Sequence, residues 1–371
     1  MSETQAEKFA RAAKEREKAE KAQGNAKPAR GWRYHVRRAV LEIIAGYVML
    51  CLILFVFQKK FIYIPGRDSN LDPRQQGFAA QQAEALEARA SDGVTIRGWH
   101  LRSGRAAAPA PEGGGAAAPV PPSGLARAPL LDLFFCGNAG NRADRRDTFI
   151  RLAGLGPDVV CFDYRGYGDS EGSPDEEGLA RDARAAWDCL IQQGVKPQQI
   201  VIHGESLGGA AAIRLAAELC AQGTPPAGLI TQATFTSLTD VAAKHYWFVP
   251  VSLILTQRFP SLERIPQVTC PILMFHGNRD DIVPFALGRR LFAAAPEKSA
   301  SGMPKQFVEL AGCGHNDIGI TDSETYVGAL RAFYTALCPE LVPKATGRTR
   351  RGGAFSDQPA PRPPREKRPR P

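Results

Sequence analysis

A serine at the apex of a short, glycine-flanked turn is the residue of this chain best placed for chemistry. The segment Gly204-Glu205-Ser206-Leu207-Gly208-Gly209 follows a β-branched run at 200–202 and precedes an alanine-rich segment. This pattern predicts a strand, a sharp turn and a helix, a nucleophile elbow that exposes the hydroxyl at the edge of a sheet. Glycines flank such a serine because its backbone is strained and larger side chains would clash. Ser206 is therefore the candidate nucleophile.

A second match to the same G-x-S-x-G spacing has Ser170 at its centre, within residues 168–172. It lies in a run dense in turn-forming residues. No helix can follow Ser170 directly, because the next helix start is at Pro174. We interpret Ser170 as a loop serine that hydrogen-bonds to backbone, and we expect its replacement to leave activity near the wild-type level.

A serine hydroxyl needs a histidine base, and a carboxylate must hold that imidazole in the right tautomer. After an elbow of this kind, the acid and then the base follow the nucleophile in the chain. Of the six histidines, only His315 lies C-terminal to everything needed, in a glycine-rich loop after an apolar strand. Asp280 follows the expected strand at 271–276, at the sheet edge where ligands bind in open α/β folds. Asp280 is the candidate acid, with Asp281 as its rival.

Two backbone N–H groups must stabilise the charge that develops on the substrate oxygen. One is expected from Leu207, the residue after the nucleophile. The other is expected from the loop after the strand at 129–136, where we favour Asn138 and keep Ala139 as the alternative. The eight cysteines contain no C-x-x-C pair, so the sequence predicts neither a metal centre nor a cofactor.

The remaining sequence supplies the elements that must position these residues. A hairpin is expected at 84–101, and from there apolar runs alternate with amphipathic segments of helical period. Strands are expected at 129–136, 158–163, 200–202, 228–230, 271–276 and 306–310, and helices at 141–155, 174–193, 207–219, 285–295 and 322–337. This alternation predicts an α/β fold with a mostly parallel sheet and helices on both faces.

An apolar run near the N-terminus predicts a membrane anchor. Residues 39–57 read AVLEIIAGYVMLCLILFVF, long enough to cross a bilayer, with Glu42 as their only charge. Eleven Lys/Arg precede the run and only three follow it closely. The positive-inside rule therefore places the N-terminus in the cytoplasm and the bulk of the chain on the opposite side. A buried core helix, a cleaved signal peptide and a helix lying in the interface are the alternatives.

The formal net charge of +9 is carried by the two ends of the chain. Residues 1–38 carry +6 and residues 344–371 carry +7, which leaves −4 for the rest, so no nucleic-acid partner is expected. The predicted organisation has five consecutive parts: a basic cytoplasmic segment (1–38), the anchor (39–61), a linker (62–83), a catalytic domain (84–340) with a flexible Ala/Pro/Gly-rich insertion (104–128), and a disordered basic Pro/Arg-rich tail (341–371).

These motifs together closely resemble the α/β-hydrolase superfamily, and within it the membrane-anchored abhydrolase-domain branch, whose domains are often labelled serine-aminopeptidase-type. The matching segments lie at 137–141, 163–168, 170–174, 204–209, 276–284 and 314–316. The resemblance implies an α/β-hydrolase fold with Ser206 as nucleophile, Asp280 as acid and His315 as base. Cys136 stands where the family usually has a structural histidine, a departure that removes no member of the triad.

We therefore expect a membrane-anchored serine hydrolase that cleaves an acyl ester or thioester through an acyl-enzyme. Its expected partners are the membrane and an acyl-containing small molecule, lipid or acylated protein. The apolar residues between 235 and 254 either line an acyl pocket, rest near lipid or simply pack within the fold. A serine aminopeptidase-type peptidase and a non-catalytic membrane scaffold with a hydrolase fold are the alternative functions.

Overall fold

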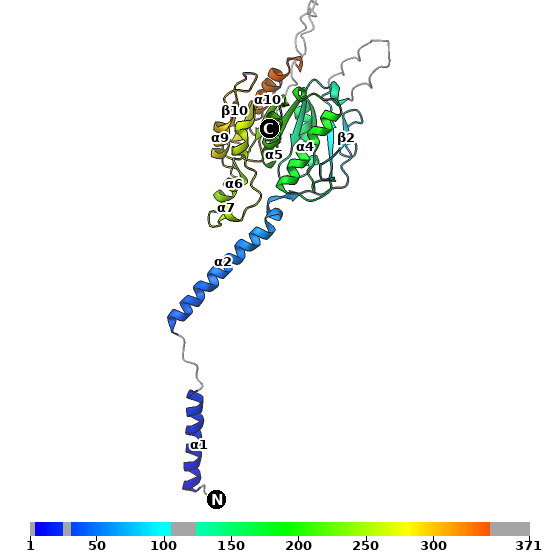
Figure 1. The fold of residues 1–371 in the computed structure, drawn as a ribbon. Coiled ribbons are helices and arrows are strands. Elements are labelled where there is room, and N and C mark those ends of the chain that lie inside the picture. The colour runs from blue at the N-terminus through cyan, green and yellow to red at the C-terminus, as the bar shows by residue number, and fades with distance from the viewer. Residues whose placement is uncertain (1–3, 25–30, 105–123, 342–371) are drawn as a thin grey trace, which may run out of the picture.

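The computed structural model describes residues 4–24, 31–104 and 124–341. An eight-stranded sheet forms the centre of the domain, in the order β10-β9-β8-β7-β4-β6-β3-β2 (Figure 1). The hairpin strands β2 and β3 are antiparallel, β3 is antiparallel to β6, and the remaining neighbours pair in parallel. The strands are β2 (Ala83–Arg89), β3 (Thr95–Leu101), β4 (Leu131–Phe135), β6 (Asp158–Phe162), β7 (Ile200–Glu205), β8 (Gly228–Gln232), β9 (Ile272–Gly277) and β10 (Gln306–Leu310). The predicted mostly parallel sheet is confirmed.

Helices cover both faces of this sheet, as predicted, because alternate residues of each strand point to opposite sides. In β4, Leu133 and Phe135 pack into the cluster formed with α4 (Glu176–Gln192) and α5 (Leu207–Ala221), whereas Phe134 packs into a second cluster. That second cluster contains α3 (Arg146–Ala153) and α10 (Ser323–Leu337). The other α-helices of the domain follow β8 in the chain. They are α6 (Leu238–His245), α7 (Val251–Ile254), α8 (Ser261–Arg264) and α9 (Phe285–Ala294).

Short 3-10 helices mark the places where the structure refines the sequence expectations. The helix expected at 141–155 begins as a 3-10 turn at Arg142–Arg145, capped by the Asn141 side chain, before α3 starts. Most of the expected insertion, residues 105–123, lies outside the described residues, but Leu125–Arg127 forms a 3-10 turn with Leu125 buried. The expected tail also lies outside the described residues, except for Leu341. This residue ends the 3-10 turn Pro339–Leu341, and its side chain is buried.

The segment expected to be a linker is built into the domain. The two-residue strand β1 (Ile64–Pro65) pairs in parallel with β5 (Ala139–Gly140). Tyr63, Leu71 and Phe78 are each at most 4% exposed, so this segment contributes to both hydrophobic clusters. A two-residue strand is too short to show a hydrophobic period, so it could not be predicted from the sequence.

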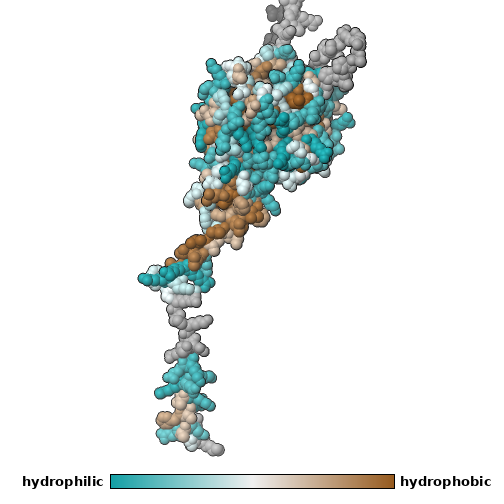
Figure 2. Space-filling model, in the orientation of Figure 1, coloured by the Kyte–Doolittle hydropathy of each residue, from teal (hydrophilic) through white to brown (hydrophobic). Residues whose placement is uncertain are grey.

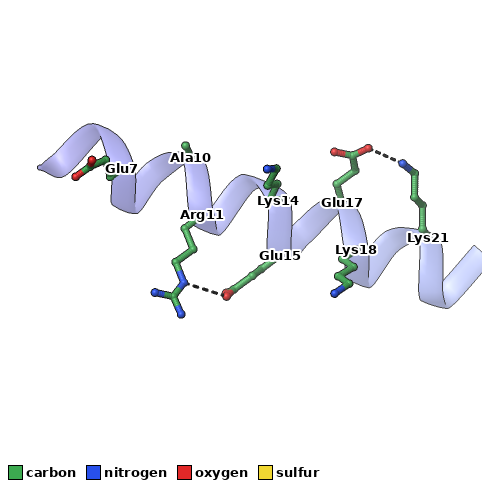
Figure 3. A pocket seen from close by; sticks show the side chains of 8 residues that line it. All are labelled: Glu7, Ala10, Arg11, Lys14, Glu15, Glu17, Lys18 and Lys21. Atoms are coloured by element: carbon green, nitrogen blue, oxygen red, sulfur yellow. Dashed lines mark hydrogen bonds and ion pairs between the residues drawn. The ribbon is translucent and has the colours of Figure 1, made fainter. Parts of the chain in front are cut away.

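Two helices precede the domain. α1 (Gln5–Gly24) carries exposed charged side chains along its length, with i,i+4 ion pairs between Arg11 and Glu15 and between Glu17 and Lys21 (Figure 3). Ion pairs of this spacing stabilise a helix whose surface is exposed to water. α2 (Trp32–Ile62) is long and apolar enough to cross a membrane. It extends the predicted span at both ends, because Lys and Arg residues also favour helix.

Candidate active site

The turn between β7 and α5 holds Ser206 in a strained conformation. Its φ is +54° and its ψ is −114°, in a region that residues with a side chain rarely adopt. A Cβ added to Gly204 would lie 2.4 Å from the carbonyl oxygen of Gly208, and one added to Gly208 would lie 2.1 Å from that of Phe135. Only glycine fits at both positions, so the local sequence fixes the elbow that presents the hydroxyl.

The structure brings the three predicted residues of the triad together. His315 Nε2 lies 3.1 Å from Ser206 Oγ, and His315 Nδ1 lies 2.8 Å from Asp280 Oδ2. The carboxylate favours the tautomer with its proton on Nδ1, which leaves Nε2 free to accept the proton of the serine hydroxyl. The three side chains lie in the turn or loop that follows the carboxyl end of β7, β9 and β10, and the parallel sheet brings these ends to one edge.

Asp280 accepts three hydrogen bonds, from His315 Nδ1 and from two backbone N–H groups. Its Oδ1 accepts from the N–H groups of Ile282 (3.0 Å) and Val283 (2.7 Å). His276 Nε2 lies 2.9 Å from the carbonyl oxygen of Val283 and 3.4 Å from Asp280 Oδ2. Burial opposes ionisation, but the interactions with His276 and His315 outweigh it and lower the pKa of Asp280 to about 2. The rival Asp281 has an exposed side chain.

The contact of His276 with Asp280 was missed by the sequence reasoning, which placed His276 only within a family motif. A histidine at the end of a buried strand, four residues before the acid, is the signal that could have found it.

Glu205 was likewise treated only as a residue of the elbow. Its carboxylate accepts two hydrogen bonds from Arg145, at 3.1 and 2.8 Å. These bonds link the end of β7 to the 3-10 turn before α3.

The two predicted oxyanion donors lie on segments that touch. Leu207 is the first residue of α5, so its N–H has no acceptor within the helix. The carbonyl of Asn138 accepts from the N–H of Ile64 (3.0 Å) and the hydroxyl of Tyr167 (2.8 Å). The Asn138 side chain donates to the carbonyl of Ile62, the last residue of α2 (2.8 Å). The loop that would receive the oxyanion is therefore fixed by the chain that leaves α2.

Cys136 begins this loop. Its Sγ lies 3.4 Å from Cys161 Sγ, and its carbonyl accepts a hydrogen bond from the hydroxyl of Tyr164 (3.1 Å). A Cβ added to Gly208 would lie 2.4 Å from the same carbonyl oxygen, so the loop runs directly against the elbow. The loop thus keeps close contact with the nucleophile although Cys136 replaces the histidine usual in the family.

Ser170 is fully buried and bound to the backbone. Its hydroxyl donates to the carbonyl of Asp163 (2.9 Å) and accepts from the N–H of Arg97 (2.9 Å). These bonds join the loop after β6 to β3. They give Ser170 the structural role that we inferred for it.

A strained serine between a strand and a helix, with its acid and base in loops that follow later strands of a parallel sheet, is the arrangement of α/β-hydrolases that act through a nucleophilic serine. The Alpha/beta hydrolase family model matches residues 133–251. An uncharacterised protein of Mycobacterium tuberculosis is 37% identical over 300 residues, which cover 80% of this chain and 93% of that protein.

Two further comparisons agree. Lysophosphatidylserine lipase ABHD12 of Danio rerio is 31% identical over 302 residues, which cover 75% of this chain and 78% of that protein. An esterase of Pyrococcus furiosus shares the fold, with a TM-score of 0.55 at 17% identity over 75% of this chain and 98% of that chain. The chain belongs to the α/β-hydrolase family, in its abhydrolase-domain branch, and it is a serine hydrolase of the esterase and lipase kind. The fold and enzyme class predicted from the sequence are confirmed.

Proposed function

We propose that this protein is a membrane-anchored serine esterase that hydrolyses an acyl ester of a lysophospholipid-like lipid. The observation that carries the proposal is the continuous hydrogen-bonded series Ser206–His315–Asp280 at a strained elbow. The 31% identity to a lysophosphatidylserine lipase supports a single-chain phospholipid as substrate. A thioester of similar chain length is the closest chemical alternative.

The geometry supports an acyl-enzyme mechanism. Ser206 Oγ attacks the acyl carbonyl while His315 Nε2 takes its proton, and the ionised Asp280 stabilises the imidazolium that forms. The N–H groups of Leu207 and Asn138 donate to the oxyanion. The tetrahedral intermediate collapses as His315 protonates the departing alcohol oxygen. A water molecule, deprotonated by His315, then attacks the acyl-enzyme and releases the fatty acid and free Ser206.

The proposed location follows from α2 and its flanks. α2 spans the bilayer, with the basic segment 1–38 in the cytoplasm and the catalytic domain on the opposite side. Only Lys59, Lys60 and Arg67 supply positive charge just after the apolar run, against eleven Lys/Arg before it. An anchored domain works beside a continuous supply of lipid, which suits an enzyme for membrane-derived substrates.

The first test is labelling of the detergent-solubilised full chain with a fluorophosphonate probe. Labelling of the wild type and of Ser170→Ala, but not of Ser206→Ala, is expected. Fatty-acid release from lysophospholipids of varied headgroup and chain length would then identify the substrate. Cleavage of aminoacyl anilides without lysophospholipid hydrolysis would support the peptidase alternative. A folded wild type that takes no label would support the scaffold alternative.

A further inference from the structure

The exposed apolar side chains of the folded domain gather in one segment, residues 246–255, which we call the tip. It comprises α7, the five residues before it and Leu255 after it. From residue 64 onward, seven large apolar side chains of the described chain are exposed, and four of them belong to the tip. The seven are Ile64 (57%), Tyr246 (54%), Trp247 (83%), Phe248 (48%), Leu253 (83%), Ile282 (44%) and Ile320 (67%). Such a concentration marks an interaction surface.

The tip lies along α2. Tyr47 donates its hydroxyl hydrogen to the carbonyl of Phe248 (2.8 Å), and Gln58 donates to the carbonyl of Ile254 (3.3 Å). Tyr47, Cys51, Leu54 and Gln58 recur at spacings of four, three and four residues, which places them on one face of α2. Figure 1 shows α7 beside α2, and Figure 2 shows apolar surface that runs from α2 onto the adjoining part of the domain.

This arrangement decides where the tip must be when α2 is in a bilayer. Tyr47 and Gln58 are eleven residues apart, about 16 Å along a helix axis. Tyr47 lies in the middle of the apolar run 39–57. A bilayer that contains this run therefore also reaches Phe248, which is bound to Tyr47.

The chemistry of the tip suits that environment. Residues 246–255 contain no charged side chain. The N–H groups of Val249, Leu253 and Leu255 donate to carbonyls within the tip, and two of its carbonyls accept from side chains of α2. Backbone groups that enter lipid need such partners, because no water is available there. Four cationic residues with exposed side chains lie close in the chain to the tip or to the end of α2: Lys59, which also pairs with Asp175, Lys60, Lys244 and Arg258.

We propose that the tip is a second membrane-inserted element, which enters the leaflet nearest the catalytic domain, and that the cations around it bind anionic lipid headgroups. The proposal rests on the proposed anchoring by α2. The residue just before the tip contacts the acid loop: His245 Nε2 lies 2.8 Å from the carbonyl oxygen of Ile282, and the N–H of Ile282 donates to Asp280. A lipid substrate therefore reaches the site from the bilayer, beside the exposed side chain of Ile282.

Tryptophan fluorescence tests the insertion without any need for turnover. The chain has four tryptophans, of which Trp99 and Trp187 are buried and Trp32 lies at the far end of α2. In a Trp32→Phe background, full-length protein is reconstituted into phosphatidylcholine vesicles with and without phosphatidylglycerol. Quenching by lipids brominated on the acyl chain, and protection from aqueous iodide, are expected, and the quenching by brominated lipid should vanish when Trp247→Phe is added. Quenching by iodide but not by brominated lipid would overturn the proposal.

Activity measurements test the delivery of substrate. Leu253→Glu places a charge on the tip, and Ile320→Glu places one on an exposed apolar residue elsewhere. Turnover of lysophospholipid in vesicles is expected to fall about tenfold for Leu253→Glu, and to change by less than about twofold for Ile320→Glu. Hydrolysis of a soluble short-chain ester should be unchanged in both. Equal losses on the two substrates, or equal effects of the two variants, would overturn delivery from the bilayer. An inactive wild type whose Trp247 is quenched by lipid would contradict the proposed function alone.

Discussion

Replacement of Asp280 by asparagine is the change whose effect follows most directly from the geometry. The Asp280 carboxylate accepts from His315 Nδ1 through one oxygen and from two backbone N–H groups through the other. An asparagine can satisfy the backbone donors only by turning its NH₂ group toward Nδ1. That contact stabilises the tautomer with the proton on Nε2, and this nitrogen can then no longer accept the proton of Ser206.

The expected loss is large. A wrong tautomer with the geometry preserved lowers kcat about 10³- to 10⁴-fold in serine hydrolases with this triad, which corresponds to about 4–5.5 kcal/mol of activation free energy. Asp281→Asn is the matched control, since it makes the same chemical change one residue away on an exposed side chain. It should keep kcat within about twofold of the wild type.

The assay is hydrolysis of a soluble p-nitrophenyl ester by the solubilised full chain, together with the rate of fluorophosphonate labelling. Thermal unfolding of both variants would show that they remain folded. A loss of activity in Asp281→Asn with retention in Asp280→Asn would refute the assignment of the acid. Equal activity of the two variants would refute the role of a carboxylate in the mechanism.

Three further predictions follow. Ser170→Ala leaves one buried carbonyl and one partly buried N–H group without their partner, so urea unfolding should show a loss of about 1–3 kcal/mol in the free energy of unfolding, with kcat retained. Gly208→Ala would place a Cβ 2.1 Å from a backbone carbonyl beside the oxyanion loop, so kcat should fall by about 10²-fold or more while an exposed Gly302→Ala stays active. Burial opposes protonation of His100, but its hydrogen bonds to Asp158 and Glu84 outweigh it and raise the pKa of the imidazole. This contribution to stability is fully present below the unfolded pKa of about 6.5 and is lost as pH rises through the folded pKa, a dependence that urea midpoints should show and that His100→Gln should remove.

Most of the sheet and its helices could be predicted because their signals are local. Buried parallel strands read as short apolar runs, and the helices between them carry an apolar face at helical spacing, so element type and order follow from the sequence. The structure differs from the predicted elements where a segment is too short to show a hydrophobic period. The strand β1, the 3-10 turn before α3 and the burial of Leu341 each involve five residues or fewer.

The candidate site also has residues that could be predicted from the sequence and contacts that could not. Ser206, Asp280 and His315 could be selected because glycines mark the elbow and because chain order separates one histidine from five others. The second contact of Asp280, with His276, could not be selected, since it depends on a bend that turns Val283 back onto the end of β9. The bond between Asn138 and the end of α2 was equally hidden, because the two residues are 76 positions apart.

The sequence by itself determined the class of this protein: periodicity set the order of strands and helices, steric need placed the glycines around Ser206, and hydropathy marked α2. The tertiary structure alone decided how these parts cooperate. It placed the tip against α2 and joined the chain that leaves α2 to the loop before Ala139. The physical reason is that hydrogen bonds and packing between distant segments depend on their approach in space, on which composition and local pattern carry no information.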